Sequence, residues 1–201
     1  SWRNSDDGFV RDVHVSKLII DPNNNNVFYA TTQGATEYTD KVGDGAGVFK
    51  STDRGNNWTQ INNGLDSLET NILTVDPNDS ETLYLGTDDD GVYKSTDGGE
   101  SWKKLTVSSL SKSFGVGDII VDPQNSNNIY IGTVDYFRLS ESRGVLGDFG
   151  IYKSTDGGKT WEEFNSGLKH LGVFSLELSE ENRILYAGTR AGGVYWISLD
   201  N

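Results

Sequence analysis

Acidic side chains gather in the stretches of the 201-residue sequence that we expect to form loops, where two carboxylates could do acid–base chemistry. Glycoside hydrolysis needs two carboxylates that face each other across a cleft. The chain carries a formal net charge of −13, so acidic loops are expected on charge alone, and solvated surface is the favoured interpretation. We therefore predict no catalytic residue, although six acidic residues stand in such stretches: Asp88, Asp89, Asp90, Asp135, Glu141 and Asp148.

A second set of residues could bind a ligand. Residues 134–150 read "VDYFRLSESRGVLGDFG", a long stretch between two expected strands. Long loops on a rigid scaffold often carry binding sites. Aromatic and arginine side chains together suit recognition of a protein or a carbohydrate. The alternative is a small apolar core beneath the loop, and both interpretations stay open for the five candidates: Tyr136, Phe137, Arg138, Arg143 and Phe149.

Other chemistries find little support. The sequence has no cysteine, which excludes disulfides, thiolate catalysis and cysteine-based zinc sites, and His14 and His170 lack metal-ligand spacing. The segments "TDDDG" and "TDKVGDG" offer oxygen ligands for at most a weak calcium site, and neither matches an EF-hand loop, so we expect no cofactor. The negative charge disfavours nucleic acids and anionic membranes as partners. No apolar run is long enough to cross a membrane.

One octapeptide occurs three times, as "STDRGNNW" from Ser51, "STDGGESW" from Ser95 and "STDGGKTW" from Ser154. An active site is usually built once, so three copies indicate architecture. The Asp-x-Gly segments favour hairpin turns, in which aspartate accepts turn N–H groups and glycine takes a positive φ. Each tryptophan offers a large apolar face to a neighbouring unit. The residues with this predicted structural role are Asp53, Gly55, Trp58, Asp97, Gly99, Trp102, Asp156, Gly158 and Trp161.

Four longer segments of the chain also align with one another. Each has an alternating apolar run, a polar turn, a second run centred on tyrosine, a glycine-containing loop and a third run such as "GVYKS". A short fourth run follows the octapeptide tryptophan in three of them. Four short strands in a unit of about 40–50 residues predict a blade of an all-β propeller. The four units of antiparallel strands span residues 14–62, 70–106, 116–165 and 173–199.

The octapeptide resembles the Asp-box, or BNR repeat, of sialidases, sortilin-type receptors and xyloglucan hydrolases. The resemblance covers almost the whole chain. It implies that the octapeptides are structural turns away from the ligand face, and that the protein is extracellular or at the cell surface, in a bacterium. We expect a non-catalytic module that binds a protein or a carbohydrate on its long-loop face, or that serves in assembly.

The alternative is a fragment of a glycoside hydrolase with an incomplete cleft. The sialidases carry an Arg-Ile-Pro motif, which is absent here because all three prolines stand in Asp-Pro dipeptides. The xyloglucan hydrolases place their cleft between two propellers. One of the two propellers is absent from this sequence, so the cleft would be incomplete.

The two ends of the chain divide a repeat between them. Trp2 precedes an Asp-Pro dipeptide at nearly the same distance as Trp58 and Trp102 do, while the last unit stops after its third strand, "GVYWIS". We therefore predict that residues 1–7 form the outer strand of the last unit. The strand could close a ring of four, join separate chains by self-association, or belong to a slice of a larger propeller. We favour a piece or processed product of a larger propeller, with strand donation between chains next.

Overall fold

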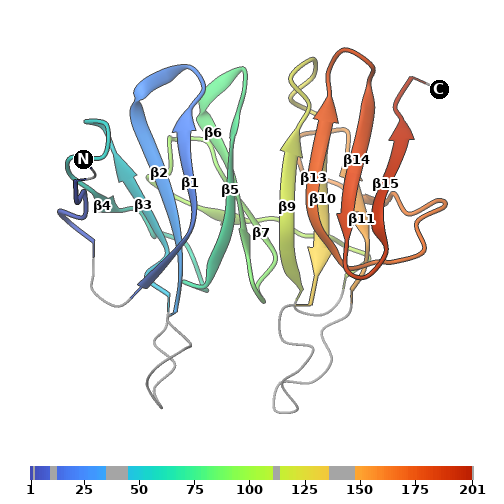
Figure 1. Ribbon diagram of the computed structural model, residues 1–201, viewed down its shortest axis with the longest axis horizontal. Coiled ribbons are helices and arrows are strands. Elements are labelled where there is room, and N and C mark those ends of the chain that lie inside the picture. Colours follow the sequence, from blue (N-terminus) through green and yellow to red (C-terminus); the bar gives the residue numbers. More distant parts are fainter. Residues whose placement is uncertain (2, 10–12, 35–44, 111–113, 136–147, 201) are drawn as a thin grey trace. The chain divides into compact units, whose positions relative to one another are not determined.

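The computed structural model describes residues 1, 3–9, 13–34, 45–110, 114–135 and 148–200. Every regular element in these ranges is a β-strand, and the strands form four antiparallel sheets (Figure 1). The all-β class predicted from the alternating patterns is therefore confirmed. The chain divides into two compact units. Unit 1 comprises Ser1–Thr87 and Tyr93–Lys104, and unit 2 comprises Asp88–Val92 and Leu105–Asn201.

Unit 1 contains the first sheet and, apart from Val92, the second. Consecutive strands are neighbours in both sheets, as in a propeller blade. The first sheet has the strands β1 (Val13–Asp21), β2 (Asn24–Gly34), β3 (Val48–Ser51) and β4 (Thr59–Gln60). The second has β5 (Thr70–Asp76), β6 (Asp79–Thr87), β7 (Val92–Ser95) and β8 (Lys103–Lys104).

Unit 2 contains the other two sheets, in the same consecutive order. The third sheet has β9 (Gly115–Val121), β10 (Ile129–Val134), β11 (Ile151–Ser154) and β12 (Glu162–Glu163). The fourth has only β13 (Val173–Ser179), β14 (Ile184–Thr189) and β15 (Gly193–Ser198). No fourth strand pairs with β15 in the part of the chain that is described, so one edge of this sheet has no strand beside it.

Each unit buries its sheets face to face. In unit 1 the second sheet places Leu73 and Leu83 against Tyr29 and Val48 of the first sheet, and Trp102 completes this core. In unit 2 the fourth sheet places Leu176 and Leu185 against Tyr130 and Ile151 of the third. The period-2 alternation of the strands explains this packing, because every second side chain points to the same face. Neighbouring sheets therefore stabilise one another through contiguous apolar contacts.

Buried aspartates at the Asp-Pro turns add a polar link between sheets. Asp21 accepts a hydrogen bond from Ser80 Oγ of the second sheet at 2.9 Å. Asp122 accepts two hydrogen bonds from the guanidinium of Arg183, in the turn between β13 and β14 of the fourth sheet, at 2.9 and 2.6 Å. Burial raises the pKa of Asp122, but the hydrogen bonds from Arg183 and the Gln124 N–H outweigh burial and leave it lowered. The carboxylate therefore stays ionised in the protein interior.

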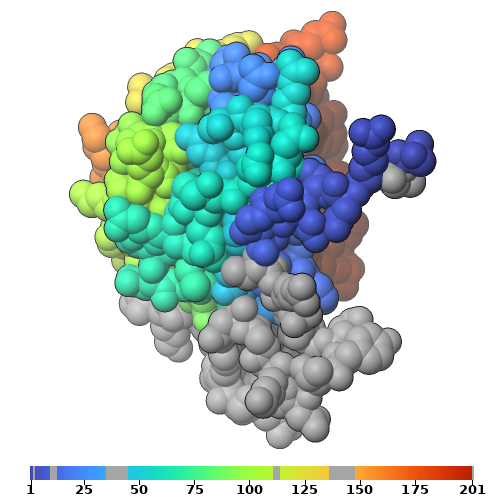
Figure 2. All heavy atoms as spheres, turned by 90° about the vertical axis from the view of Figure 1, so that its left-hand side faces the viewer, coloured from blue at the N-terminus to red at the C-terminus, as the bar shows by residue number. Residues whose placement is uncertain are grey.

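Residues 3–9 lie against the first sheet. Trp58 donates its indole N–H to the Ser5 carbonyl at 3.1 Å and its backbone N–H to the Asp7 carbonyl at 2.8 Å. Phe9 stacks on Phe49 with ring centroids 4.3 Å apart. In Figure 2 the blue N-terminal segment lies over the neighbouring cyan segment of this unit. The described residues among 1–7 form no strand here, and the pairing predicted between residues 1–7 and the fourth sheet stays a prediction.

Replacing Trp102 with alanine should strongly destabilise the protein. Its side chain is only 5% exposed and packs in the core of unit 1, so truncation leaves a cavity. We expect the free energy of unfolding to fall by about 3–5 kcal/mol in urea titrations. Trp196→Ala is the control, because Trp196 is 67% exposed and should change stability by about 0.5 kcal/mol or less. Equal effects of the two replacements would contradict the packing role of Trp102.

Candidate functional site

The three octapeptides form the same turn, each at the same end of its own sheet. In the second sheet, Asp97 accepts hydrogen bonds from Ser95 Oγ at 2.6 Å and from the Ser101 N–H at 2.9 Å. Ser95 Oγ in turn accepts the Gly99 N–H at 2.9 Å. Asp53 and Asp156 make the corresponding contacts in their own turns. These carboxylates are therefore bound within the turns, the role that the repetition of the motif predicted for them.

Backbone conformation explains why the turns require glycine. Gly55, Gly99 and Gly158 have φ values of +84°, +91° and +89°, a region that residues with a Cβ rarely adopt. Each turn leads into a buried tryptophan, and all three indoles are less than 10% exposed. The octapeptides thus join a hydrogen-bonded turn to a buried apolar anchor.

The opposite end of each sheet carries the connection between its second and third strands. In unit 1, residues 35–47 join β2 to β3. Glu69 holds the two sides of this connection together, because its carboxylate accepts the Gly34 N–H at 2.9 Å and the Gly45 N–H at 2.8 Å. Thr70 adds a hydrogen bond from its hydroxyl to the Gly47 carbonyl at 2.9 Å. The base of the loop is therefore fixed by a neighbouring connection of the same unit.

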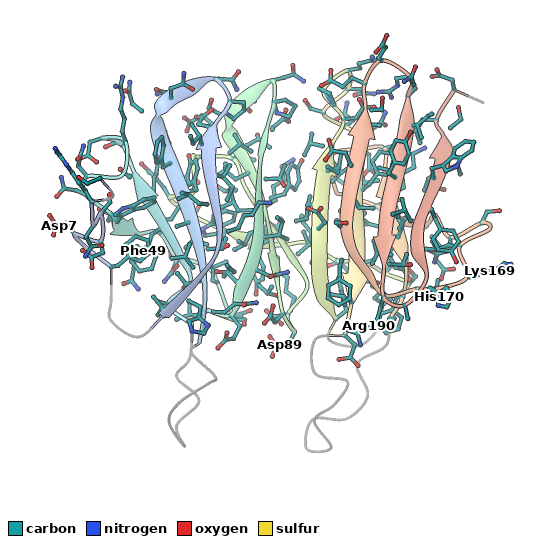
Figure 3. All side chains as sticks on the ribbon, viewed as in Figure 1. Asp7, Phe49, Asp89, Lys169, His170 and Arg190 are labelled. Carbon is teal, nitrogen blue, oxygen red and sulfur yellow. The ribbon has the colours of Figure 1, made fainter. Side chains whose placement is uncertain are left out.

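In unit 2, residues 135–150 join β10 to β11, and their base is fixed in a similar way. Asp148 Oδ1 accepts the Asp135 N–H at 2.9 Å. Arg190 donates to the Asp135 carbonyl at 2.6 Å, and its guanidinium lies over the Phe174 ring, 5.1 Å from the centroid. Figure 3 shows Arg190 at the strand ends from which this connection leaves. Phe174 is 41% exposed, so its aromatic ring is partly open to solvent beside the loop base.

The predicted binding loop is described only in part. Phe149 is half-buried, and its backbone is held by Thr133 Oγ1 and by the Asn165 side chain, at 3.0 Å each. The other four candidates lie outside the described residues: Tyr136, Phe137, Arg138 and Arg143.

The acidic candidates are placed differently from one another. Asp88 and Asp135 are buried, Asp89 and Asp90 are half-buried, and Glu141 lies outside the described residues. Asp148 accepts the Asp135 N–H at the loop base.

Among the residues that are described, no group of three or more His, Cys, Asp or Glu side chains could hold a metal ion. The described part of the chain also has no helix long and apolar enough to cross a membrane.

Sequence reasoning missed Glu69, Phe174 and Arg190. Glu69 contacts a glycine 35 positions away, and Arg190 contacts a carbonyl 55 positions away. Neither contact leaves a periodic signal in one sequence. Alignment of the four repeats could have marked Phe174 and Arg190, because both stand at the loop end of the fourth sheet. The longest connection, residues 135–150, belongs to the neighbouring third sheet.

The octapeptide aspartates predict how stability depends on pH. Hydrogen bonds from Ser101 and Ser95 lower the pKa of Asp97 from its ordinary value of 3.8 to about 2. A lowered pKa in the folded state adds stability above the unfolded pKa, and this stability is lost as the pH falls from about 4 towards 2. In Asp97→Asn, acid unfolding should therefore depend less steeply on pH in this range. The control is Asp66→Asn, an exposed carboxylate outside the octapeptides. A slope for Asp97→Asn equal to that of the wild type would contradict the proposed hydrogen-bonded carboxylate.

Comparison with known proteins places the fold among β-propellers. The chain is 34% identical to the xyloglucanase Xgh74A of Acetivibrio thermocellus over 96 residues, which cover 43% of this chain and 11% of the relative. The solved GH74 enzyme of Niastella koreensis has a TM-score of 0.68 and 29% identity, over 92% of this chain and 28% of that one. YCF48 of Cyanidioschyzon merolae, at 12% identity and a TM-score of 0.62 over 93% of this chain and 51% of its own, shares the fold alone.

The matched relatives are much longer than this chain. It spans 11% of the xyloglucanase and 28% of the GH74 enzyme, so it corresponds to a part of each. The repeats predicted as propeller blades are thereby confirmed as propeller structure. A family model, Sortilin-Vps10 (sortilin, neurotensin receptor 3), matches residues 46–194, which is more than half of the sequence. The chain therefore belongs to the Sortilin-Vps10 family of Asp-box propellers.

Proposed function

We propose that this chain is an extracellular carbohydrate-binding part of a propeller, which binds a xyloglucan-type polysaccharide at the loop end of its sheets and does not cleave it alone. The observation that carries this proposal is the exposed Phe174 ring, held by Arg190 beside the base of the longest connection. The similarity to a xyloglucanase and to a GH74 enzyme supports a polysaccharide over a protein ligand. An extracellular location follows from the proposed ligand, because wall polysaccharides lie outside cells.

The Phe174 ring and the Arg190 guanidinium together suit the binding of a sugar ring. A pyranose has a face of C–H groups and a rim of hydroxyls, so it can lie on an aromatic ring and hydrogen-bond to polar groups at its edge. The Arg190 backbone N–H donates to the Gly172 carbonyl at 2.7 Å, and its side chain donates to the Asp135 carbonyl. Both ends of this residue are thus fixed before a ligand arrives. Preorganisation lowers the entropic cost of binding.

The hydrogen bonding and burial of Asp148 and Asp135 support binding without cleavage. A hydrolytic pair must be open to the substrate on opposite sides of the scissile bond. Asp148 instead accepts a backbone N–H of Asp135, and Asp135 is only 1% exposed. Their arrangement favours a structural role at the base of the loop.

The second candidate function is one wall of a xyloglucan hydrolase cleft. The 34% identity to the xyloglucanase favours it, and Asp89 and Asp90 lie half-buried in the β6–β7 connection, with Asp89 at the loop-carrying strand ends in Figure 3. In this case the second carboxylate comes from outside the described residues. The two candidates share the polysaccharide and differ in turnover.

Calorimetric titration with xyloglucan oligosaccharides tests the proposal. Phe174→Ala should weaken binding about tenfold, or about 1.4 kcal/mol, because the stacking surface is lost. The matched control is Trp196→Ala, which removes an exposed aromatic ring from the middle of β15 in the same unit. A wild-type chain that does not bind the oligosaccharides, or a Phe174→Ala chain that binds as well as the wild type, would refute the proposed site.

Reducing-sugar assays separate the two candidates. We expect no release of sugar from xyloglucan or from sialosides by this chain. Turnover that is abolished by Asp89→Asn, Asp90→Asn or Asp148→Asn, with binding retained, would instead establish the hydrolase candidate.

A further inference from the structure

His170 stands at the loop-carrying end of the fourth sheet, in the same unit as Phe174 and Arg190. Residues 164–172 connect β12 to β13 and carry His170, and residues 190–192 connect β14 to β15 and begin with Arg190. Figure 3 shows His170 and Arg190 at this end of unit 2. His170 is exposed, although its imidazole contacts the β14–β15 turn. It is therefore an accessible ring on the turn that also carries Arg190.

Gly192 lets the imidazole lie directly on this turn. A Cβ at Gly192 would lie 2.4 Å from His170 Cδ2, and 2.6 Å from both His170 Cγ and Thr189 Oγ1. Gly193, the next residue, has a φ of +76°, but Gly192 lies outside the positive-φ region, so its backbone conformation does not require a glycine. Close packing, with the imidazole nearest, is what excludes a side chain at residue 192.

Contacts on the protein side hold the imidazole in place. The Gly192 backbone lies against the ring, and the centroid of the Tyr195 ring lies 6.5 Å from that of the imidazole. The Arg190 N–H donates to the Gly172 carbonyl at 2.7 Å, which fixes the two connections against each other. The ring is thus ordered before a ligand arrives, and little side-chain freedom is lost when one binds.

The aligned repeats show that the fourth sheet departs from the second at this end. Residues 62–73 align without gaps with residues 165–176, as do residues 87–92 with residues 189–194. Ser67 and Asn71 stand where the fourth sheet has His170 and Phe174. Five acidic residues of the second repeat also have no acidic counterpart, because Asp66, Glu69, Asp88, Asp89 and Asp90 align with Lys169, Gly172, Arg190, Ala191 and Gly192. Both sheets keep the same architecture without these exchanges, so the exchanges indicate recognition and not folding.

An imidazole suits the chemistry of a sugar. Its two ring nitrogens donate or accept hydrogen bonds, which matches the hydroxyl groups at the edge of a pyranose. Arg190 and Gly192 are two residues apart, so their Cα atoms are at most about 7.6 Å apart. The aromatic ring held by Arg190 and the imidazole held by Gly192 can therefore contact neighbouring sugars of one polysaccharide chain.

We infer that His170 is a second sugar-contacting residue, which binds the sugar unit next to the one that stacks on Phe174. Gly192 is a positioning residue, because it supports the imidazole and acts through it. This inference rests on the carbohydrate-binding proposal and extends it. A site with two such contacts recognises successive sugar units, so it selects a polysaccharide over a single sugar.

Nuclear magnetic resonance tests the contact directly, because His14 and His170 are the only histidines in the sequence. His14 stands in β1 of unit 1. When the full chain is titrated with a xyloglucan oligosaccharide at constant pH, the imidazole C–H resonances of His170 should shift and saturate with the dissociation constant found by calorimetry. Those of His14 should not move. The spectrum of His170→Ala assigns the two sets of resonances.

Calorimetry with the same oligosaccharide measures what the ring contributes. His170→Ala should weaken binding about fivefold. Gly192→Ala should have an effect of similar size, because its Cβ displaces the imidazole. The double variant should bind no more weakly than His170→Ala, since Gly192 acts through His170. The matched control is Lys169→Ala, which truncates the neighbouring exposed side chain and should bind like the wild type. All four variants should unfold at urea concentrations similar to that of the wild type.

The outcomes separate this inference from the proposal on which it rests. Binding that depends on Phe174, with stationary His170 resonances or unchanged affinity of His170→Ala, would overturn the second contact and leave the first. A shift of the His14 resonances alone, or a loss of affinity in Lys169→Ala equal to that in His170→Ala, would also overturn it. A wild-type chain that binds no oligosaccharide would overturn both.

Discussion

The contact of a buried tryptophan with the connection that precedes its own sheet is the interaction on which the rest of this structure depends. A four-stranded sheet of this kind has two faces to cover, and a short outer strand of two residues contributes few backbone hydrogen bonds. Trp102 compensates because it lies in the core against which Ile61 and Leu65 pack, while both of its N–H groups donate to carbonyls of that connection. One side chain thus fixes the outer strand of one sheet and the position of that sheet against its neighbour.

This arrangement makes the two ends of each sheet differ. The octapeptide end is rigid, because aspartate, serine and glycine satisfy one another's hydrogen bonds within eight residues. The opposite end can vary in length without loss of that packing. The structure fixes the bases of its two long connections through Glu69 and through Arg190 with Asp148, so insertions of different sequence can extend from a common scaffold. Loops on such scaffolds are where binding commonly evolves.

Much of the fold could be predicted from the sequence because its determinants are local. Alternating runs define the strands, and the turn chemistry of Ser-Thr-Asp-x-Gly requires only neighbouring residues. The candidate site is different. The Arg190–Phe174 pair and the Glu69 clamp depend on which connections the fold brings together, and no local pattern records those distances. Gly64 was missed for a similar reason. Its φ is +92°, and a Cβ there would lie 2.2 Å from the Trp102 carbonyl oxygen, which no local sequence pattern records.

A double-mutant cycle between Trp102 and Leu65 tests the central interaction most directly. We predict that Trp102→Ala and Leu65→Ala are not additive in the free energy of unfolding, because Trp102 belongs to the core of unit 1 and Leu65 packs against that same core. Their coupling should lie in the range of about 0.5–3 kcal/mol that contacting residues show. A coupling of zero within error would mean that the tryptophan stabilises its own sheet only, and it would contradict the conclusion that this contact holds neighbouring sheets together.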